Sequence, residues 1–119
     1  MNHDIYLRLN GETLEWSDTQ DGSYAAVGPS SPSTPVNGTD TVTFHGGDGI
    51  QKIMKIDDGK NGSPKLIKAK RGEDSNTVVA TIKDTTVRGE IDQYSIKVKP
   101  EGGGQPITVD PDMHGEGNP

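Results

Sequence analysis

The residues best suited to chemistry lie near the end of the chain, where two carboxylates and an imidazole fall within five positions. Asp110, Asp112 and His114 are separated by Pro111 and Met113. Carboxylate and imidazole groups are both ligands of divalent metal ions, so one hypothesis is a metal site built on this trio. In the alternative, which we favour, Asp110 and Pro111 end a strand and a polar tail follows. A strong site would need a further ligand from elsewhere in the chain.

The other two histidines, His3 and His45, stand at or just beyond the ends of predicted strands. They could complete a metal site only if the fold brought them together, and we expect all three histidines to be exposed in loops. The run 57–62 resembles the start of a calcium loop. However, its third position is Gly59 and its twelfth is Lys68, where that loop needs Glu. Turn chemistry explains the same letters.

No catalytic motif stands out elsewhere in the chain. The glycine-rich runs 46–49 and 102–104 match no phosphate-binding fingerprint, and no nucleophile-elbow motif accompanies the many Ser and Thr residues. The sequence therefore predicts a protein that is not an enzyme and that carries no cofactor.

Charge is distributed unevenly along the chain. The net charge is −6, which argues against nucleic acid as the main partner because phosphate binding needs positive charge. Most Lys and Arg residues lie between positions 52 and 71. If Lys65, Lys68, Lys70 and Arg71 project from one hairpin, they form a basic surface for an acidic protein or for another copy of the chain. The alternative is an edge hairpin whose lysines prevent edge-to-edge aggregation.

The composition limits where and how the chain folds. Hydrophobic residues make up 28% of the sequence and Cys is absent, which excludes disulfides and thiolate metal sites. The N-terminus has no apolar segment typical of a signal peptide, and no stretch is long and apolar enough to span a membrane. We therefore expect a cytoplasmic protein without a membrane partner.

The elements that must position these groups are strands. Short segments with period-two alternation, rich in Val, Ile and Thr, are separated by turn residues every 8–12 positions, and no helix of ten residues is indicated. The pattern predicts an all-β, antiparallel Greek-key β-sandwich of about eight short strands. We expect one domain over residues 1–110, a flexible polar tail over 111–119, and a long exposed connection through the Pro-rich segment 28–38.

Several positions carry sharper expectations. Tyr94, at the start of a late strand, is placed like a tyrosine corner, whose hydroxyl bonds to backbone. The spacing of apolar residues over 50–56 fits both a helix and a strand, and the flanking glycines favour a strand with a bulge. The residues expected to be substantially buried are Tyr6, Trp16, Phe44, Ile96 and Val98.

The last third of the chain resembles a known group of small bacterial proteins. A Tyr-led strand over 92–98, a Gly-rich turn and a terminal strand that closes on Asp110-Pro111-Asp112-Met113 are similar to the DP-EP family of cupredoxin-like or immunoglobulin-like sandwich proteins. The resemblance implies a sandwich fold and no assigned activity. A blue-copper site is excluded, since it needs a Cys ligand.

Together these features predict a non-catalytic accessory or protein-interaction domain that acts through its surface, on an acidic protein partner or as a homo-oligomer. The alternative function is a small β-sandwich that binds a ligand or a divalent metal through loop carboxylates and histidines.

Overall fold

The computed structural model describes residues 2–28, 33–37, 40–58, 67–71, 76–82, 91–109 and 112–117. This part of the chain contains eleven strands and no helix. The strands are β1 (Asn2–Asn10), β2 (Thr13–Ser17), β3 (Ala25–Ala26), β4 (Ser33–Asn37), β5 (Thr41–Gly46), β6 (Ile50–Asp58), β7 (Ile67–Arg71), β8 (Thr77–Ile82), β9 (Ile91–Pro100), β10 (Ile107–Val109) and β11 (Asp112–Gly117). Within the described residues, no helix is long and apolar enough to cross a membrane.

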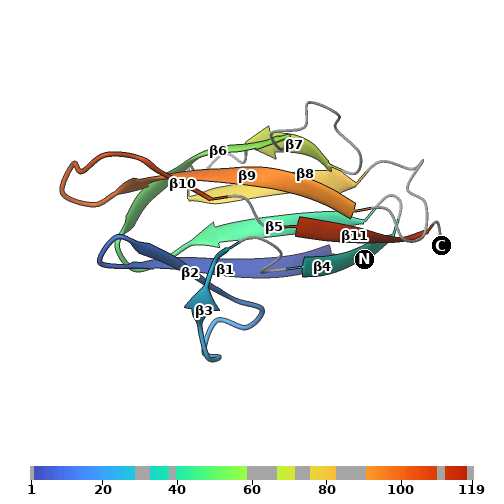
Figure 1. Ribbon diagram of the computed structural model, residues 1–119, viewed down its shortest axis with the longest axis horizontal. Coiled ribbons are helices and arrows are strands. Elements are labelled where there is room, and N and C mark those ends of the chain that lie inside the picture. Colours follow the sequence, from blue (N-terminus) through green and yellow to red (C-terminus); the bar gives the residue numbers. More distant parts are fainter. Residues whose placement is uncertain are drawn as a thin grey trace.

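The strands form two sheets that pack face to face, which confirms the all-β sandwich (Figure 1). The first sheet has six strands in the order β3-β2-β1-β5-β8-β7. The second contains β4, β6, β9, β10 and β11, with β9 at its centre. Both sheets contribute to one core, whose buried members are Ile5, Leu7, Leu14, Val42, Phe44, Ile50, Ile53, Ile56, Val78, Ala80, Ile96 and Val98.

The first sheet is built around β1, which pairs with β2 in an antiparallel hairpin and with β5 in parallel. The predicted turn at Asn10 is confirmed, and Gly11 adopts a φ of 64°, which favours glycine. Successive side chains of a strand point to opposite faces, so Ile5 and Leu7 enter the core while Tyr6 and Arg8 stand on the outer face.

β6 is a bulged strand, as the sequence indicated. Ile50, Ile53 and Ile56 are all buried and lie opposite every second residue of β9, because register shifts at Gln51 and Met54 each insert one extra residue. The spacing of three that suggested a helix therefore comes from two bulges. The run 46–49 carries the chain from β5 in one sheet to β6 in the other.

The C-terminal segment is not the unpaired tail that we expected. β10 and β11 continue along the same edge of β9 in one register, since Ile107 pairs with Val98 and Asp112 with Gln93, five positions further along each strand. β11 also pairs in parallel with β4, within the Pro-rich segment predicted to be a connection. Pro35 is tolerated because β4 is an edge strand, where a missing N–H removes no ladder bond on its open side.

The predicted core residues are buried with two exceptions. Phe44, Ile96 and Val98 are fully buried, and Trp16 is half-buried against the core. Tyr6 does not join the core: it is half-buried on the outer face, where alternation from Ile5 places it. Tyr94 lies in β9 opposite Asp58, but its hydroxyl lies outside what the structure describes, so the tyrosine corner stays a prediction.

Candidate functional site

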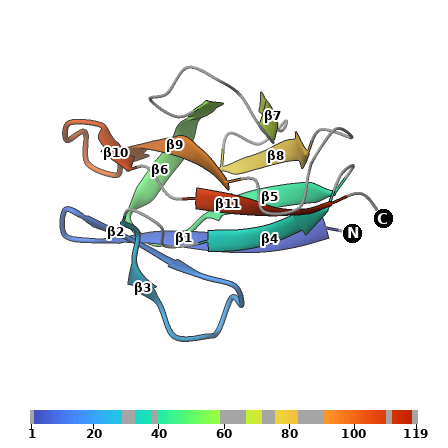
Figure 2. The same cartoon turned by 45° about the vertical axis from the view of Figure 1, so that its right-hand side comes forward.

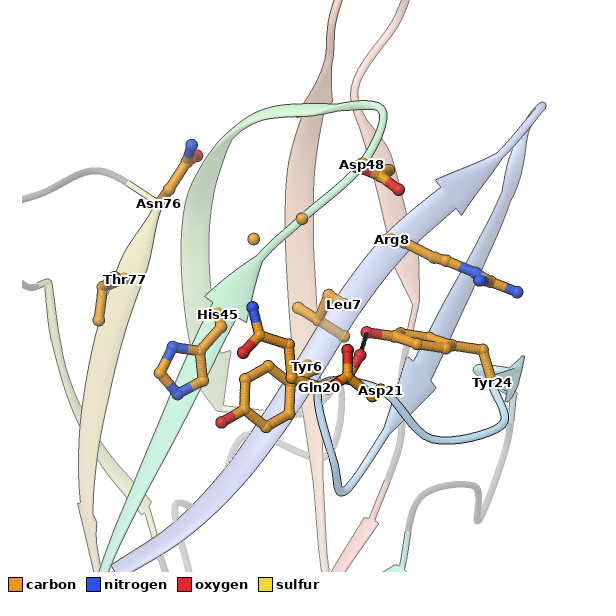
Figure 3. Close-up of a pocket in the computed structure, with 12 residues that line it drawn as sticks. Tyr6, Leu7, Arg8, Gln20, Asp21, Tyr24, His45, Asp48, Asn76 and Thr77 are labelled. Atoms are coloured by element: carbon orange, nitrogen blue, oxygen red, sulfur yellow. Dashed lines mark hydrogen bonds between the residues drawn. The ribbon is translucent and has the colours of Figure 1, made fainter.

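A hollow in the described part of the molecule lies on the outer face of the six-stranded sheet (Figure 3). It is open to solvent on one side and has a volume of about 640 Å³. Its walls come from β1, the 18–24 loop, the end of β5 and the start of β8. The lining residues are Tyr6, Leu7, Arg8, Gln20, Asp21, Tyr24, His45, Gly46, Gly47, Asp48, Asn76 and Thr77.

One wall of the hollow is a stacked pair of rings. Tyr6 and His45 are direct neighbours in the β1–β5 register, and their ring centroids are 4.5 Å apart with planes 11° from parallel. His45 Nε2 lies 2.9 Å from Oδ1 of Asp4, two residues before Tyr6 on the same face. Since a carboxylate only accepts, Nε2–H donates this bond. The imidazole is thus held on one side by a ring and at its edge by a carboxylate.

The opposite wall combines Arg8 with a second aromatic ring. Arg8 Nε donates to Oε1 of Glu15 at 2.7 Å, across the β1–β2 pair. The same guanidinium lies over the ring of Tyr24, 4.1 Å from its centroid, which is a cation–π contact. Arg8 is therefore oriented from two sides.

The loop between β2 and β3 carries Tyr24 to this position and projects away from the rest of the fold (Figure 2). Ser17 Oγ accepts from the backbone N–H of Thr19 at 3.2 Å, and Tyr24 Oη donates to the carbonyl of Gln20 at 3.2 Å. A Cβ at Gly22 would meet the side-chain hydroxyls of Thr19 and Ser17, which would have to shift. The loop is thus organised by local bonds.

The floor of the hollow is backbone. Gly47 N–H donates to the carbonyl of Leu7 at 2.8 Å, and Gly46 N–H donates to the carbonyl of Asn76 at 2.8 Å. A Cβ at Gly47 would lie 2.7 Å from that carbonyl oxygen, so only glycine permits this approach. The absence of side chains at both glycines leaves the floor open between the walls.

The hollow offers both hydrogen-bond donors and hydrogen-bond acceptors beside the faces of aromatic rings. Asp21 and Asp48 are exposed acceptors, Arg8 is a donor, and Gln20 and Asn76 carry amides that both donate and accept. Figure 3 shows the Gln20 side chain close to Tyr6 and the ring of Tyr24 across from them. Such a surface can bind a ligand that has many hydroxyl groups and apolar C–H faces.

His3 and His45 are not the exposed loop histidines that we expected. Both lie in strands, and each is bonded to an aspartate distant in sequence. His3 Nε2 is 2.8 Å from Oδ2 of Asp40, a residue only 4% exposed, and the Asn37 N–H donates to the same oxygen at 2.9 Å. Burial raises the pKa of Asp40, but the bonds from His3 and Asn37 more than offset it, so this pKa lies below its ordinary value of 3.8.

The predicted metal trio is only partly described. Asp112 and His114 occupy alternate positions of β11, opposite Gln93 and Ile91 of β9. Asp110 lies outside the described residues. Among the described side chains, no group of three or more His, Asp or Glu residues is placed to hold a metal ion.

The predicted basic surface is divided by strand alternation. Lys68 and Lys70 pair with Thr81 and Val79 of β8, whereas Arg71 pairs with Val78, which is buried in the core. Positions 68 and 70 therefore belong to the outer face of the six-stranded sheet and position 71 to the opposite face. Lys65 lies outside the described residues.

Comparison with known proteins does not place this chain in a family. No family model matches it. No curated protein matches it either. What the fold defines is the class, an all-β two-sheet sandwich with a hollow on one outer face.

Sequence reasoning did not find the hollow, although one signal was available. The alternation that buries Ile5 and Leu7 also exposes Tyr6 and Arg8, and large residues on an outer face are typical of binding surfaces. The contribution of Tyr24 depended on the course of the 18–24 loop, which no local pattern shows.

Proposed function

We propose that this chain is a non-catalytic binding domain that holds a neutral saccharide in the hollow on the outer face of its six-stranded sheet. The observation that carries the proposal is the pairing of two aromatic walls with hydrogen-bonding groups of both signs. An apolar ring face beside a few placed polar groups is the usual composition of a small-molecule site.

The charged groups of the hollow favour a neutral ligand over an ion. An anionic ligand would be attracted by Arg8, but this side chain is already bonded to Glu15. Asp21 and Asp48 would repel such a ligand. A cation would meet the guanidinium of Arg8. Hydroxyl groups both donate and accept, so they can satisfy Asp48, Gln20 and Arg8 together. C–H faces of a sugar ring can pack on Tyr6 and Tyr24.

The basic groups near the hollow are held by carboxylates, which preorganises its walls. His45 is bonded to Asp4 and Arg8 to Glu15. These pairs fix the orientation of the walls. A preorganised surface of this kind lowers the ordering cost of binding.

The test is titration with a panel of neutral hexasaccharides of glucose, mannose, galactose and xylose, followed by the amide NMR signals of the protein. Gly46 and Gly47 line the floor, so their backbone amide signals are local reporters. We expect at least one saccharide to shift them with a dissociation constant of roughly 0.1–1 mM, as suits a shallow polar site. Tyr24→Ala should weaken this binding at least fivefold, whereas Thr108→Ala, exposed on the other sheet, should leave it unchanged.

Two outcomes would contradict the proposal. One is an unchanged set of glycine signals with every saccharide at 20 mM. The other is a shift produced by methylguanidinium or sulfate and by no saccharide, which would assign the hollow to an ion. Tyr24→Phe, which keeps the ring, separates loss of ring contact from loss of the bond to Gln20.

We further propose that the chain belongs to the DP-EP family, acts as an interaction domain and is located in the cytoplasm. A divalent-metal site at Asp110, Asp112 and His114 is the alternative, supported by the alternate positions that Asp112 and His114 occupy on β11. Zinc or calcium that raised the melting temperature of the parent but not of His114→Ala would favour it.

A further inference from the structure

The outer face of the second sheet carries a compact group of lysines. In the β6–β9 register, Lys52 lies opposite Lys99 and Lys55 lies opposite Lys97. We call Lys52, Lys55, Lys97 and Lys99 the lysine quartet. Their neighbours Ile53, Ile56, Ile96 and Val98 point into the core, so alternation places all four lysines on the outer face.

Two pairs of lysines that face each other across neighbouring strands destabilise the sheet. Residues directly opposite on neighbouring strands have Cβ atoms about 4.5–5.5 Å apart, and like charges at that distance repel. Within the described residues, no ion pair reaches Lys52, Lys97 or Lys99. Among the described acidic residues, Asp57 lies opposite Ser95 at one margin of the quartet, and Glu101 stands in the turn after β9.

The bulges of β6 create this alignment. Without them, strict alternation from the buried Ile50 would direct Lys52 toward the core and Ile53 toward solvent. The two extra residues, Gln51 and Met54, bring Lys52 and Lys55 into register with alternate positions of β9. Bulges and lysines also protect edge strands from aggregation, but that protection does not require lysines on the inner strand β9.

We infer that the lysine quartet is a docking surface for an acidic protein segment in extended conformation, with carboxylates at alternate positions. Lys97 and Lys99 are two residues apart on β9, which corresponds to about 6.6–6.8 Å along the strand. Carboxylates at positions i and i+2 of an extended peptide have the same spacing. Lysines opposite on β6 flank them from the other side.

Other polyanions fit this surface less well. Described neighbours on this face include Ser95 and Thr108 but no aromatic ring on which a nucleic acid base could stack. Arginine, whose fork matches phosphate, is absent from the quartet. The chain as a whole carries a charge of −6, which repels a long polyanion beyond the patch. A short acidic segment can contact the lysine quartet without extending over the negatively charged surface around it.

The experiment uses fluorescein-labelled peptides and the full chain, with binding followed by fluorescence anisotropy. One peptide alternates Glu and Thr over eight residues, and the other has the same composition with the four Glu residues in one block. We expect the alternating peptide to bind at least fivefold more tightly. Lys97→Gln combined with Lys99→Gln should weaken its binding at least tenfold, and raising the salt from 20 to 200 mM should do likewise.

The control is Lys68→Gln combined with Lys70→Gln, which removes the same charge from the other sheet. A twofold or smaller loss is expected for it. Equal losses in both double variants, or equal affinity for both peptides, would overturn the inference because the effect would then be general attraction. Tighter binding of heparin or single-stranded DNA of matched charge would also overturn it. So would self-association of the parent, seen by ultracentrifugation, that Lys97→Gln with Lys99→Gln abolishes, since the occupant would be a second copy.

Discussion

The two outer faces of the sandwich are built by the same alternation of side chains, but they treat charge differently. On the six-stranded sheet, Arg8 is bonded to Glu15 and His45 to Asp4, and these pairs frame a hollow. On the second sheet, Lys52 and Lys99 face each other across a strand pair. The first face pairs these charged side chains with one another, while Asp21 and Asp48 stay exposed in the lining of the hollow. The other presents a group of lysines, of which Lys52, Lys97 and Lys99 have no ion pair within the described residues.

This difference predicts two modes of recognition. The hollow selects by shape and by placed hydrogen bonds, so its affinity should depend weakly on salt. The lysine quartet, Lys52, Lys55, Lys97 and Lys99, selects by charge and spacing, so its affinity should fall steeply with salt. Binding of a saccharide and of an acidic segment should then be independent, because the two sites lie on opposite layers (Figure 1).

The largest expected effect tests the strand on which the second face depends. Ile53→Ala should destabilise the fold by about 2–5 kcal/mol, because it removes a fully buried side chain from between the sheets. Deletion of Met54, the second bulge residue, should cost less, since Ile53, Lys55 and Ile56 would then alternate regularly. Urea denaturation of both variants measures the difference. A deletion more damaging than Ile53→Ala would contradict the bulge assignment.

A second prediction concerns the internal pairing that is typical of the first sheet. Asp40→Ala should lower stability at pH 7 by about 1–3 kcal/mol, the range for a bond to a buried charged group. Since folding lowers the pKa of Asp40, its contribution is complete above pH 3.8 and declines as the pH falls through the lowered pKa. Parent and variant should therefore converge in acid. A constant difference between pH 7 and pH 2.5 would show that the charge is not responsible.

The stacked rings give a third, smaller effect. A double-mutant cycle of Tyr6→Ala and His45→Ala should yield a coupling energy of about 0.5–1.5 kcal/mol, the range for paired rings. Thermal or urea unfolding of the four proteins supplies the cycle. A coupling near zero would mean that the rings are neighbours without mutual stabilisation, and the hollow would then lack a fixed wall.

The smallest effect has the opposite sign and lies on the other face. Lys99→Thr should raise stability by about 0.2–1 kcal/mol at low salt, because it removes the repulsion from Lys52. The gain should shrink at 0.5 M salt, where the Debye length is only a few ångströms. Denaturation midpoints at both salt concentrations measure this. A loss of stability at low salt would show that Lys99 has a favourable partner in the folded protein.

The sequence by itself determined the strands and much of the core. Period-two alternation and β-branched residues predicted the all-β sandwich and the burial of Phe44, Ile96 and Val98. This was possible because the alternation of inward and outward side chains within one strand depends only on residues close in the sequence. The same alternation, applied consistently from Ile5, would have placed Tyr6 outside. These features depend on neighbours within a few residues, and a single sequence carries that information.

Only the tertiary structure decided which strands are neighbours and therefore what each face carries. The bonds of His45 to Asp4 and of His3 to Asp40 join residues 41 and 37 positions apart, so no local spacing reveals them. β4 and β11 became strands because each supplies the other's backbone partners, although Pro35 argued against one of them. The lysine quartet depends on the β6–β9 register, which is set by two bulges. Because these bulges bury Ile53, the positions of the lysines follow from the packing of the core.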